Sequence, residues 1–190
     1  LAVGCLHAHA WQYPEIRECW EEPIFLYKKE PIDKALSRLG NPLPHAVAFS
    51  CYVWNWRFNL ALAKAIREAS PHTAIVFGGV HVPDNADEFF NGEHGKLADC
   101  LLHGEAEGSF AEFMRQFPND QDWDKVKGLS SYSGVRNKRE FIPLEQMRSP
   151  YIDGTFDAVY KQERRWQVLQ ETNRGCPYAC TFSANGEVPP

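Results

Sequence analysis

The stretch TAIVFGGVHVPD, from Thr73 to Asp84, carries the clearest indication of the fold class. Its residues 74–77 are apolar without a polar interruption, which is typical of a strand that is buried on both faces of a sheet. Gly78 and Gly79 follow directly. Because glycine has no Cβ, the backbone can turn sharply here and a ligand can approach it closely, although a plain strand-ending turn is the alternative. The stretch therefore predicts a buried strand that ends in a loop suited to ligand binding.

Similar apolar runs lie on both sides of this stretch and alternate with helical patterns. We expect strands at 1–6, 23–27, 46–53, 73–79 and 98–105, and helices at 31–39, 57–69 and 109–117. Strands that alternate with helices favour right-handed crossovers and a parallel sheet with helices on both faces. We therefore predict an α/β fold, Rossmann-like (flavodoxin-like), with a five-stranded parallel sheet in the order 2-1-3-4-5 and an irregular C-terminal extension.

The character of the sequence changes twice along the chain. Residues 1–118 carry the strand and helix patterns and are expected to form the α/β domain. Residues 119–170 are predicted to be a connecting segment of loops with one polar hairpin. Residues 171–190 are expected to be the truncated start of another domain.

Composition narrows the class of protein. The 190 residues are 44% hydrophobic and 13% aromatic, which is enough to bury a core. A formal net charge of −5 without a dense Lys/Arg run argues against a nucleic-acid partner. The longest apolar runs, such as Ala74–Val80, are too short to cross a membrane. Four of the six cysteines stand singly in apolar or helical contexts, so we expect no disulfide framework and a cytoplasmic location.

Polar and aromatic residues follow the expected strands where ligands bind in open α/β sheets, beyond the carboxyl ends. Four loops qualify, namely His7–Trp11, Ser50–Trp56, Gly78–Asp84 and Gly104–Gly108. In the second loop, the hydroxyls of Ser50 and Tyr52 can donate hydrogen bonds to amides or a phosphate. The run YVWNW offers flat apolar surface for a large ring system. A buried aromatic cluster is the alternative for this run, and we favour the buried cluster for Trp56.

These loops carry a resemblance to a known family. The segments FSCYVWNW, FGGVHVPD, LLHGEAEGSF and ETNRGCPYACTF occur in the order found in cobalamin-dependent radical S-adenosylmethionine (SAM) enzymes. The resemblance covers nearly the whole chain: a cobalamin-binding domain, a connecting segment and the opening of the radical SAM domain. Ser50-x-Tyr52 resembles the Ser-x-Leu element of cobalamin domains, and Gly78-Gly79 resembles their Gly-Gly turn.

The resemblance implies the cobalamin-binding portion of a radical SAM enzyme, most often a methyltransferase that acts through methylcobalamin on a small molecule. A non-catalytic cobalamin-binding or sensing module and a flavodoxin-like nucleotide-binding domain are the alternatives. The cofactors implied for the parent enzyme are cobalamin, a 4Fe-4S cluster and S-adenosylmethionine. The implied cobalamin-binding residues are Ser50, Tyr52, Val53, Trp54, Gly78, Gly79, His81, Gly104 and Glu105.

Three of these residues carry further expectations. A bulky side chain at Gly79 is expected to block the cobalamin nucleotide tail and to leave the sheet folded. His81 is expected to lie near that tail rather than to bind cobalt. Glu105 is expected to meet corrin amides, with a solvated position at a helix start as the alternative.

The C-terminal motif is the most specific part of the resemblance. In the family three thiolates hold the cluster, because soft anionic ligands suit iron and sulfide. Cys176 and Cys180 match the first two ligands, and Ser183 stands at the third position. Since a serine hydroxyl is a poor substitute for a thiolate, this chain as given is expected to be inactive in cluster chemistry. An engineered substitution, a truncated or foreign tail, and residues joined across a gap are three open explanations.

The first loop departs from the cobalamin pattern. Cobalamin domains with a histidine ligand to cobalt carry Asp-x-His-x-x-Gly, where this chain has Cys5, His7 and Ala10. His7 is the candidate for the lower cobalt ligand and His9 is a weaker one. Without the Asp, no obvious group orients the imidazole. A loop histidine near the corrin face is the alternative.

Overall fold

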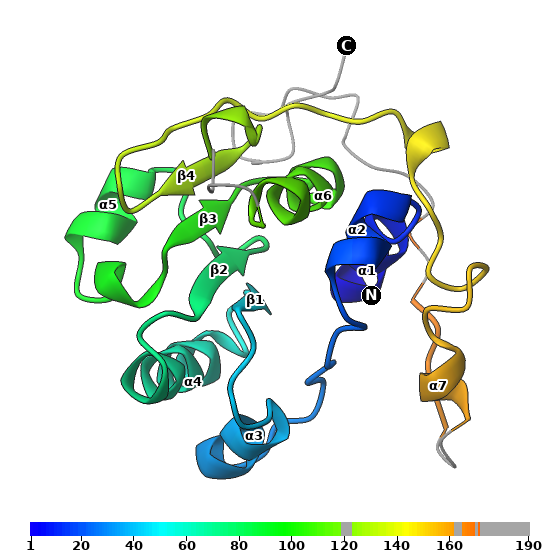
Figure 1. Cartoon of the computed structure of the whole chain (residues 1–190), viewed down its shortest axis with the longest axis horizontal. Coiled ribbons are helices and arrows are strands. Elements are labelled where there is room, and N and C mark those ends of the chain that lie inside the picture. The colour runs from blue at the N-terminus through cyan, green and yellow to red at the C-terminus, as the bar shows by residue number, and fades with distance from the viewer. Residues whose placement is uncertain (119–122, 162–164, 170, 172–190) are drawn as a thin grey trace.

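The computed structural model describes residues 1–118, 123–161, 165–169 and 171 (Figure 1). Its sheet has the strand order β1-β2-β3-β4. Strands β1, β2 and β3 are parallel, and β4 is antiparallel to β3. The strands are β1 (Ala46–Ser50), β2 (Ala74–Gly78), β3 (Cys100–Leu102) and β4 (Leu129–Ser131). Because Ser50 pairs with Gly78 and Gly78 with Leu102, the three parallel strands end together at one edge of the sheet.

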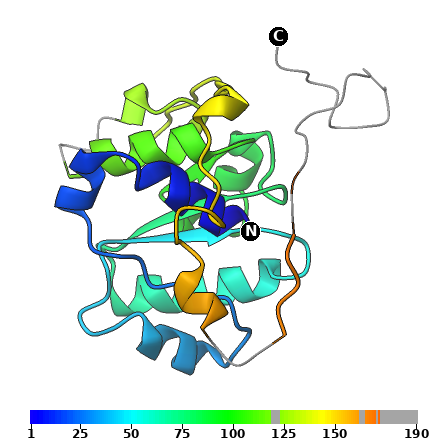
Figure 2. The ribbon, with the colours of Figure 1, turned by 90° about the vertical axis from the view of Figure 1, so that its right-hand side faces the viewer.

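Helices cover both faces of this sheet, as Figure 2 shows. The α-helices are α1 (Ala2–Ala10), α2 (Pro14–Cys19), α3 (Ile32–Arg38), α4 (Trp56–Ala69), α5 (Ala86–Asn91), α6 (Glu107–Gln116) and α7 (Asp157–Tyr160). The 3₁₀ turns are η1 (Gly95–Leu97), η2 (Trp123–Lys125) and η3 (Leu144–Gln146). Helices α3 and α4 lie on one face, and α1, α2 and α6 lie on the other.

The alternation of side chains along β2 builds the two halves of the core. Ile75 and Phe77 are fully buried and pack with residues of α4, whereas Val76 between them packs with residues of α6. Strands buried on both faces read as continuous apolar runs, and this is the reason why residues 74–77 carry no polar side chain. The predicted α/β class is confirmed, and so are the three neighbouring parallel strands read from 46–53, 73–79 and 98–105.

The five-stranded sheet in the order 2-1-3-4-5 is not confirmed. Residues 1–6, predicted as a strand, lie in α1, and residues 23–27 pair with no strand among the described residues. The run AVGCLHAHA is rich in alanine and almost free of β-branched residues, so its intrinsic preference favours a helix. Helix α1 packs against α6 and buries Ala8 and Ala10. Apolar character alone misled the prediction, because a short buried helix and a buried strand look alike in sequence.

Candidate functional site

The parallel strands place three loops at the carboxyl edge of the sheet: the loops after β1, β2 and β3. The fourth predicted loop, His7–Trp11, is not a strand-end loop, because His7 lies within α1. The other three predicted loops do come together at this edge, since the strands before them are in register. The edge is therefore the candidate ligand site.

Two asparagines hold the loop after β1 in shape. The Ser50 carbonyl accepts hydrogen bonds from Asn55 Nδ2 at 2.8 Å and from Asn59 Nδ2 at 3.2 Å. The Tyr52 backbone N–H donates to Asn55 Oδ1 at 2.8 Å. Asn59 is buried, so its amide also satisfies polar groups that water does not reach. Sequence reasoning missed both residues; the position of Asn55 at the start of α4 is a usable signal for that residue, whereas Asn59 lies inside the helix.

The loops after β1 and β2 expose apolar side chains to solvent. Val53 and Trp54 are each 72% exposed, and Val80 is 85% exposed. We call these three residues the apolar rim. The rings of Tyr52 and Trp54 are stacked, with centroids 4.5 Å apart and an interplanar angle of 9°. Exposed apolar side chains that gather at one edge indicate a binding surface more than a structural one. They suit a wide, flat and mostly apolar ligand.

Gly79 is required by the contact between the loops after β1 and β2. Its φ is +100°, and a Cβ at this position would lie 2.8 Å from the Cys51 carbonyl oxygen and 2.9 Å from the Cys51 nitrogen. Gly78 differs, because a Cβ there would make ordinary contacts of 3.6–3.7 Å with Leu102. The geometry therefore does not support the expectation that a bulky residue at Gly79 leaves the sheet undisturbed. A change at Gly78 is the gentler probe of this loop.

Two side chains close to the edge have structural roles. Burial raises the pKa of the Cys51 thiol to about 11, although a hydrogen bond from Asn59 lowers it, so the thiol stays protonated and unreactive near neutral pH. Trp56 packs its ring against Phe77 and His81, with centroids 5.6 and 5.1 Å apart. This arrangement agrees with the buried aromatic cluster that we favoured for Trp56.

The edge becomes polar beyond β3. Gly104 has φ +71°, and a Cβ there would lie 3.1 Å from Cδ of Arg139. Glu105 is half-buried beside it. A pocket of about 330 Å³ adjoins them, between the loop after β2 and the segment after β4. Two ion pairs line it, Arg136 with Asp87 and Arg139 with Asp84. The carboxyl edge therefore has an apolar part over β1 and β2 and a charged part over β3 and β4.

His103 ties the charged part to the sheet. Its Nε2 lies 3.0 Å from the Ser130 hydroxyl oxygen, so the end of β3 is joined to β4. Burial lowers the pKa of His103, and the positive charge of Arg139 lowers it further. The imidazole is therefore neutral near neutral pH and acts as a hydrogen-bonding link.

His7 has partners on both ring nitrogens. Its Nδ1 lies 3.2 Å from the Thr155 hydroxyl, and its Nε2 lies 3.2 Å from a Glu22 carboxylate oxygen. The Trp11 ring is 4.3 Å away, centroid to centroid. Burial lowers the pKa of His7 by more than Glu22 raises it. A cobalt ligand role for His7 stays a prediction, and it would require one of these two contacts to break.

The remaining predictions on metal and membrane lie partly outside the described residues. Cys176, Cys180 and Ser183 belong to the part of the chain that is not described. Among the described residues no group of three or more His, Cys, Asp or Glu side chains is arranged to hold a metal ion. No helix in the described part of the chain is long and apolar enough to cross a membrane.

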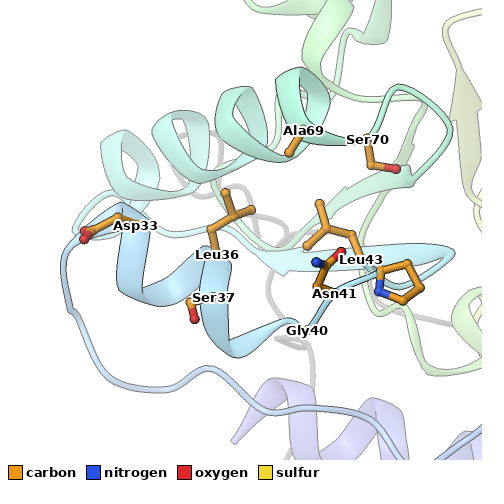
Figure 3. Close-up of a pocket in the computed structure, with 9 residues that line it drawn as sticks. Asp33, Leu36, Ser37, Gly40, Asn41, Leu43, Ala69 and Ser70 are labelled. Carbon is orange, nitrogen blue, oxygen red and sulfur yellow. The ribbon is translucent and has the colours of Figure 1, made fainter.

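A second pocket, of about 440 Å³, lies away from the carboxyl edge (Figure 3). It is lined by the C-terminal ends of α3 and α4, including Leu36 and Ala69, and by the turn at Gly40. These segments lead into the amino ends of β1 and β2. The second pocket therefore does not belong to the site built by the strand-end loops.

Comparison with known proteins gives three relatives, whereas no family model matches the chain. The cobalamin-dependent radical SAM methyltransferase TokK of Streptomyces tokunonensis is 37% identical over 194 aligned residues, which cover 96% of this chain and 28% of TokK. The 2-(S-pantetheinyl)-carbapenam-3-carboxylate methyltransferase of Streptantibioticus cattleyicolor is 33% identical over 194 aligned residues, which cover 96% of this chain and 28% of that enzyme. The hopanoid C-3 methylase of Methylococcus capsulatus is 28% identical over 159 residues, which cover 77% of this chain and 29% of the methylase. The chain thus spans less than a third of the length of these relatives.

Proposed function

The chain belongs to the family of cobalamin-dependent radical SAM enzymes, and we propose that it is the cobalamin-binding portion of a methyltransferase that acts through methylcobalamin on a small molecule. Two relatives whose names contain "methyltransferase" match 96% of the chain, which supports this reaction class. When bound, cobalamin supplies the methyl carrier, and in the parent enzyme S-adenosylmethionine at a 4Fe-4S cluster supplies the radical.

The observation that carries the proposal is the apolar rim at the carboxyl edge. Val53, Trp54 and Val80 stay exposed although each is strongly apolar, so a flat apolar ligand laid over them would remove this surface from water. Ser50 and Gly78 pair with each other at the strand ends that lead into the loops after β1 and β2. The residues present therefore fit a corrin ring with amide side chains.

We assign roles to the predicted binding residues on this basis. Tyr52, Val53 and Trp54 hold the ring through apolar contact, and Ser50 and Gly78 line the space at the strand ends. Gly79 shapes the loop rather than the ligand space. His81, Gly104 and Glu105 stand along the same edge and contact the outer amides or the nucleotide tail.

Titration of hydroxocobalamin tests the proposal. We expect the wild-type chain to change the visible spectrum of the cofactor saturably, and we expect Trp54→Asp to weaken binding by about tenfold or more, because a charge replaces apolar contact. Leu144→Asp is the matched control, since Leu144 is 55% exposed but lies in η3, outside the strand-end loops. Absence of binding by the wild-type chain, or equal binding by Trp54→Asp, contradicts the proposed site.

Two further measurements separate the proposal from its alternatives. Saturable binding of flavin mononucleotide in place of cobalamin would favour the flavodoxin-like reading. A longer natural protein that binds cobalamin but does not cleave S-adenosylmethionine would favour a non-catalytic sensing module.

The C-terminal cysteines call for a separate experiment. We propose that Ser183 prevents this chain from holding a stable cluster with Cys176 and Cys180, because a hydroxyl replaces the third thiolate. Anaerobic reconstitution followed by iron and sulfide analysis should give well below about four of each per chain. A longer protein with Ser183→Cys should regain the cluster. A full complement of iron and sulfide in the unchanged chain contradicts this proposal.

A further inference from the structure

The outer edge of β1 is open. Strand β1 stands at the end of the strand order, and among the residues that the structure describes it pairs with β2 alone. The Ala74 N–H donates to the His45 carbonyl at 2.8 Å, and the Cys51 N–H donates to the Gly78 carbonyl at 2.6 Å. In a parallel ladder the N–H and C=O of one residue point to the same side and alternate along the strand. The odd-numbered residues 45–51 therefore face β2, and Ala46 and Ala48 turn their backbone groups to the open side.

These backbone groups of β1 are available for pairing. Ala48 is exposed, and within the described residues neither its N–H nor its C=O forms a hydrogen bond. The Ser50 carbonyl on the same side differs, because Asn55 and Asn59 satisfy it. Edge strands in proteins are normally protected by charged residues, proline, bulges or a covering loop. The run AVAFS of β1 contains no charged residue and no proline, and its mainly apolar composition is typical of an interior strand.

A second extended segment lies on the open side of β1 and also lacks a strand partner. Figure 1 shows the chain between α2 and α3 passing there. Among the described residues, Ile24, Phe25 and Leu26 form no backbone hydrogen bond. Leu26 packs against the core that β1 shares with α4, whereas Ile24 remains 54% exposed. The core thus extends past β1 toward this segment, although no strand from the described part of the chain fills the position between them.

We propose that the open edge of β1 receives one further β-strand, supplied by the part of the parent protein that lies outside these 190 residues. The choice of the parent chain rests on the family assignment above, because the relatives are more than three times as long as the chain that matches them. The added strand pairs with Ala46 and Ala48 and extends the sheet beside the apolar rim. The candidate site is therefore incomplete at the end of β1 without this strand.

Amide hydrogen exchange with residue-level fragmentation tests the proposal without using cobalamin. In the 190-residue chain the Ala48 N–H should exchange at least about a hundredfold faster than the Val47 and Phe49 N–H groups, which face β2. In the longer natural protein the Ala48 N–H should slow to the level of its neighbours. Fast exchange at Ala48 in the longer protein overturns the proposal. Protection at Ala48 that is lost when the 190-residue chain is diluted overturns it as well, because the partner is then a second copy.

A pair of variants of the longer protein gives a second readout. Ala48→Pro removes the outward N–H and should lower the melting temperature of the longer protein, whereas it should leave that of the 190-residue chain nearly unchanged. Ala48→Val keeps the N–H and is the matched control. Equal melting temperatures for both variants in the longer protein contradict the added strand. Failure of cobalamin binding alone leaves this result intact and counts only against the proposed function.

Discussion

The two edges of the sheet are built differently. At the β4 edge the strand is short, and the chain turns back to cover it: the Ser131 N–H donates to the Val135 carbonyl, and the Asn137 N–H donates to the Leu129 carbonyl. At the β1 edge an apolar strand leaves the backbone groups of Ala46 and Ala48 without partners among the described residues. The described residues therefore cover the sheet edge at β4 but leave the edge at β1 open, which is the position where we propose the added strand.

The same division runs along the carboxyl edge. The end of β1 carries the apolar rim and a loop fixed by backbone contact at Gly79. The end of β3 carries charged side chains and Gly104. A Cβ added at Gly104 would first meet the flexible side chain of Arg139. The β1 side is thus rigid and apolar, and the β4 side is polar and adjustable.

The largest effect is expected from proline at the inner register of β1. Val47→Pro removes an N–H that faces β2, so we expect it to lower the free energy of unfolding of the 190-residue chain by about 3 kcal/mol or to prevent folding. Ala48→Pro removes an outward N–H and should cost less than about 1 kcal/mol. Urea unfolding followed by circular dichroism measures both values. Equal losses would show that the β1 edge is not open as described.

Gly79→Ala should have the next largest effect. The substitution forces a side chain onto a backbone with φ +100° and places a Cβ within 3 Å of two Cys51 backbone atoms. We expect a loss of about 2 kcal/mol in the free energy of unfolding. Gly78→Ala is the matched control, because its Cβ meets only ordinary contacts, and should cost less than about 1 kcal/mol. A Gly79→Ala protein as stable as Gly78→Ala would refute the rigid contact between the two loops.

Asn55→Ala should loosen the loop that carries the apolar rim. The variant loses the hydrogen bonds to the Ser50 carbonyl and from the Tyr52 N–H, and we expect a loss of about 1–2 kcal/mol in stability. Cobalamin affinity should fall with it, because Trp54 is no longer held in place. Asn55→Asp keeps the acceptor for Tyr52 and should lose less of both. Unchanged affinity in Asn55→Ala would mean that the loop is positioned by other contacts.

The smallest effect concerns pH and the β4 side. Because burial lowers the folded-state pKa of His103, the unfolded chain binds the proton more readily. The stability that the neutral imidazole contributes is full above the unfolded-state pKa of about 6.5, and it is lost as pH falls from there toward the lowered folded-state pKa. Melting temperatures between about pH 5 and pH 8 should fall less steeply toward acid for His103→Gln than for the wild type. Since His7 and His9 also have lowered pKa values, part of the slope should remain. Identical slopes would exclude His103 as a contributor.

The central three strands of the sheet could be predicted from sequence patterns alone. Mainly apolar segments at 46–53, 73–79 and 98–105 predicted the three parallel strands, and the glycines near the ends of the second and third segments marked the turns there. The carboxyl ends of parallel strands meet at one edge of a sheet, so the position of Ser50, Gly78 and Gly104 at that edge followed from pattern and topology. The resemblance of the four segments to cobalamin-dependent radical SAM enzymes was confirmed by the relatives.

The remaining features depend on contacts between residues far apart in the chain, which the sequence pattern does not report. Residues 1–6 are as apolar as a strand, but α6 offers them a helical partner, and so they form α1. The sequence predicted that Gly79 leaves room for a ligand, but a Cβ there would meet the Cys51 backbone. The sequence showed no group that orients His7, but Thr155 and Glu22 contact its two ring nitrogens. A sequence pattern reports which face of an element is apolar. It does not report which distant segment covers that face, and the open edge of β1 is visible only once the neighbours of every strand are in place.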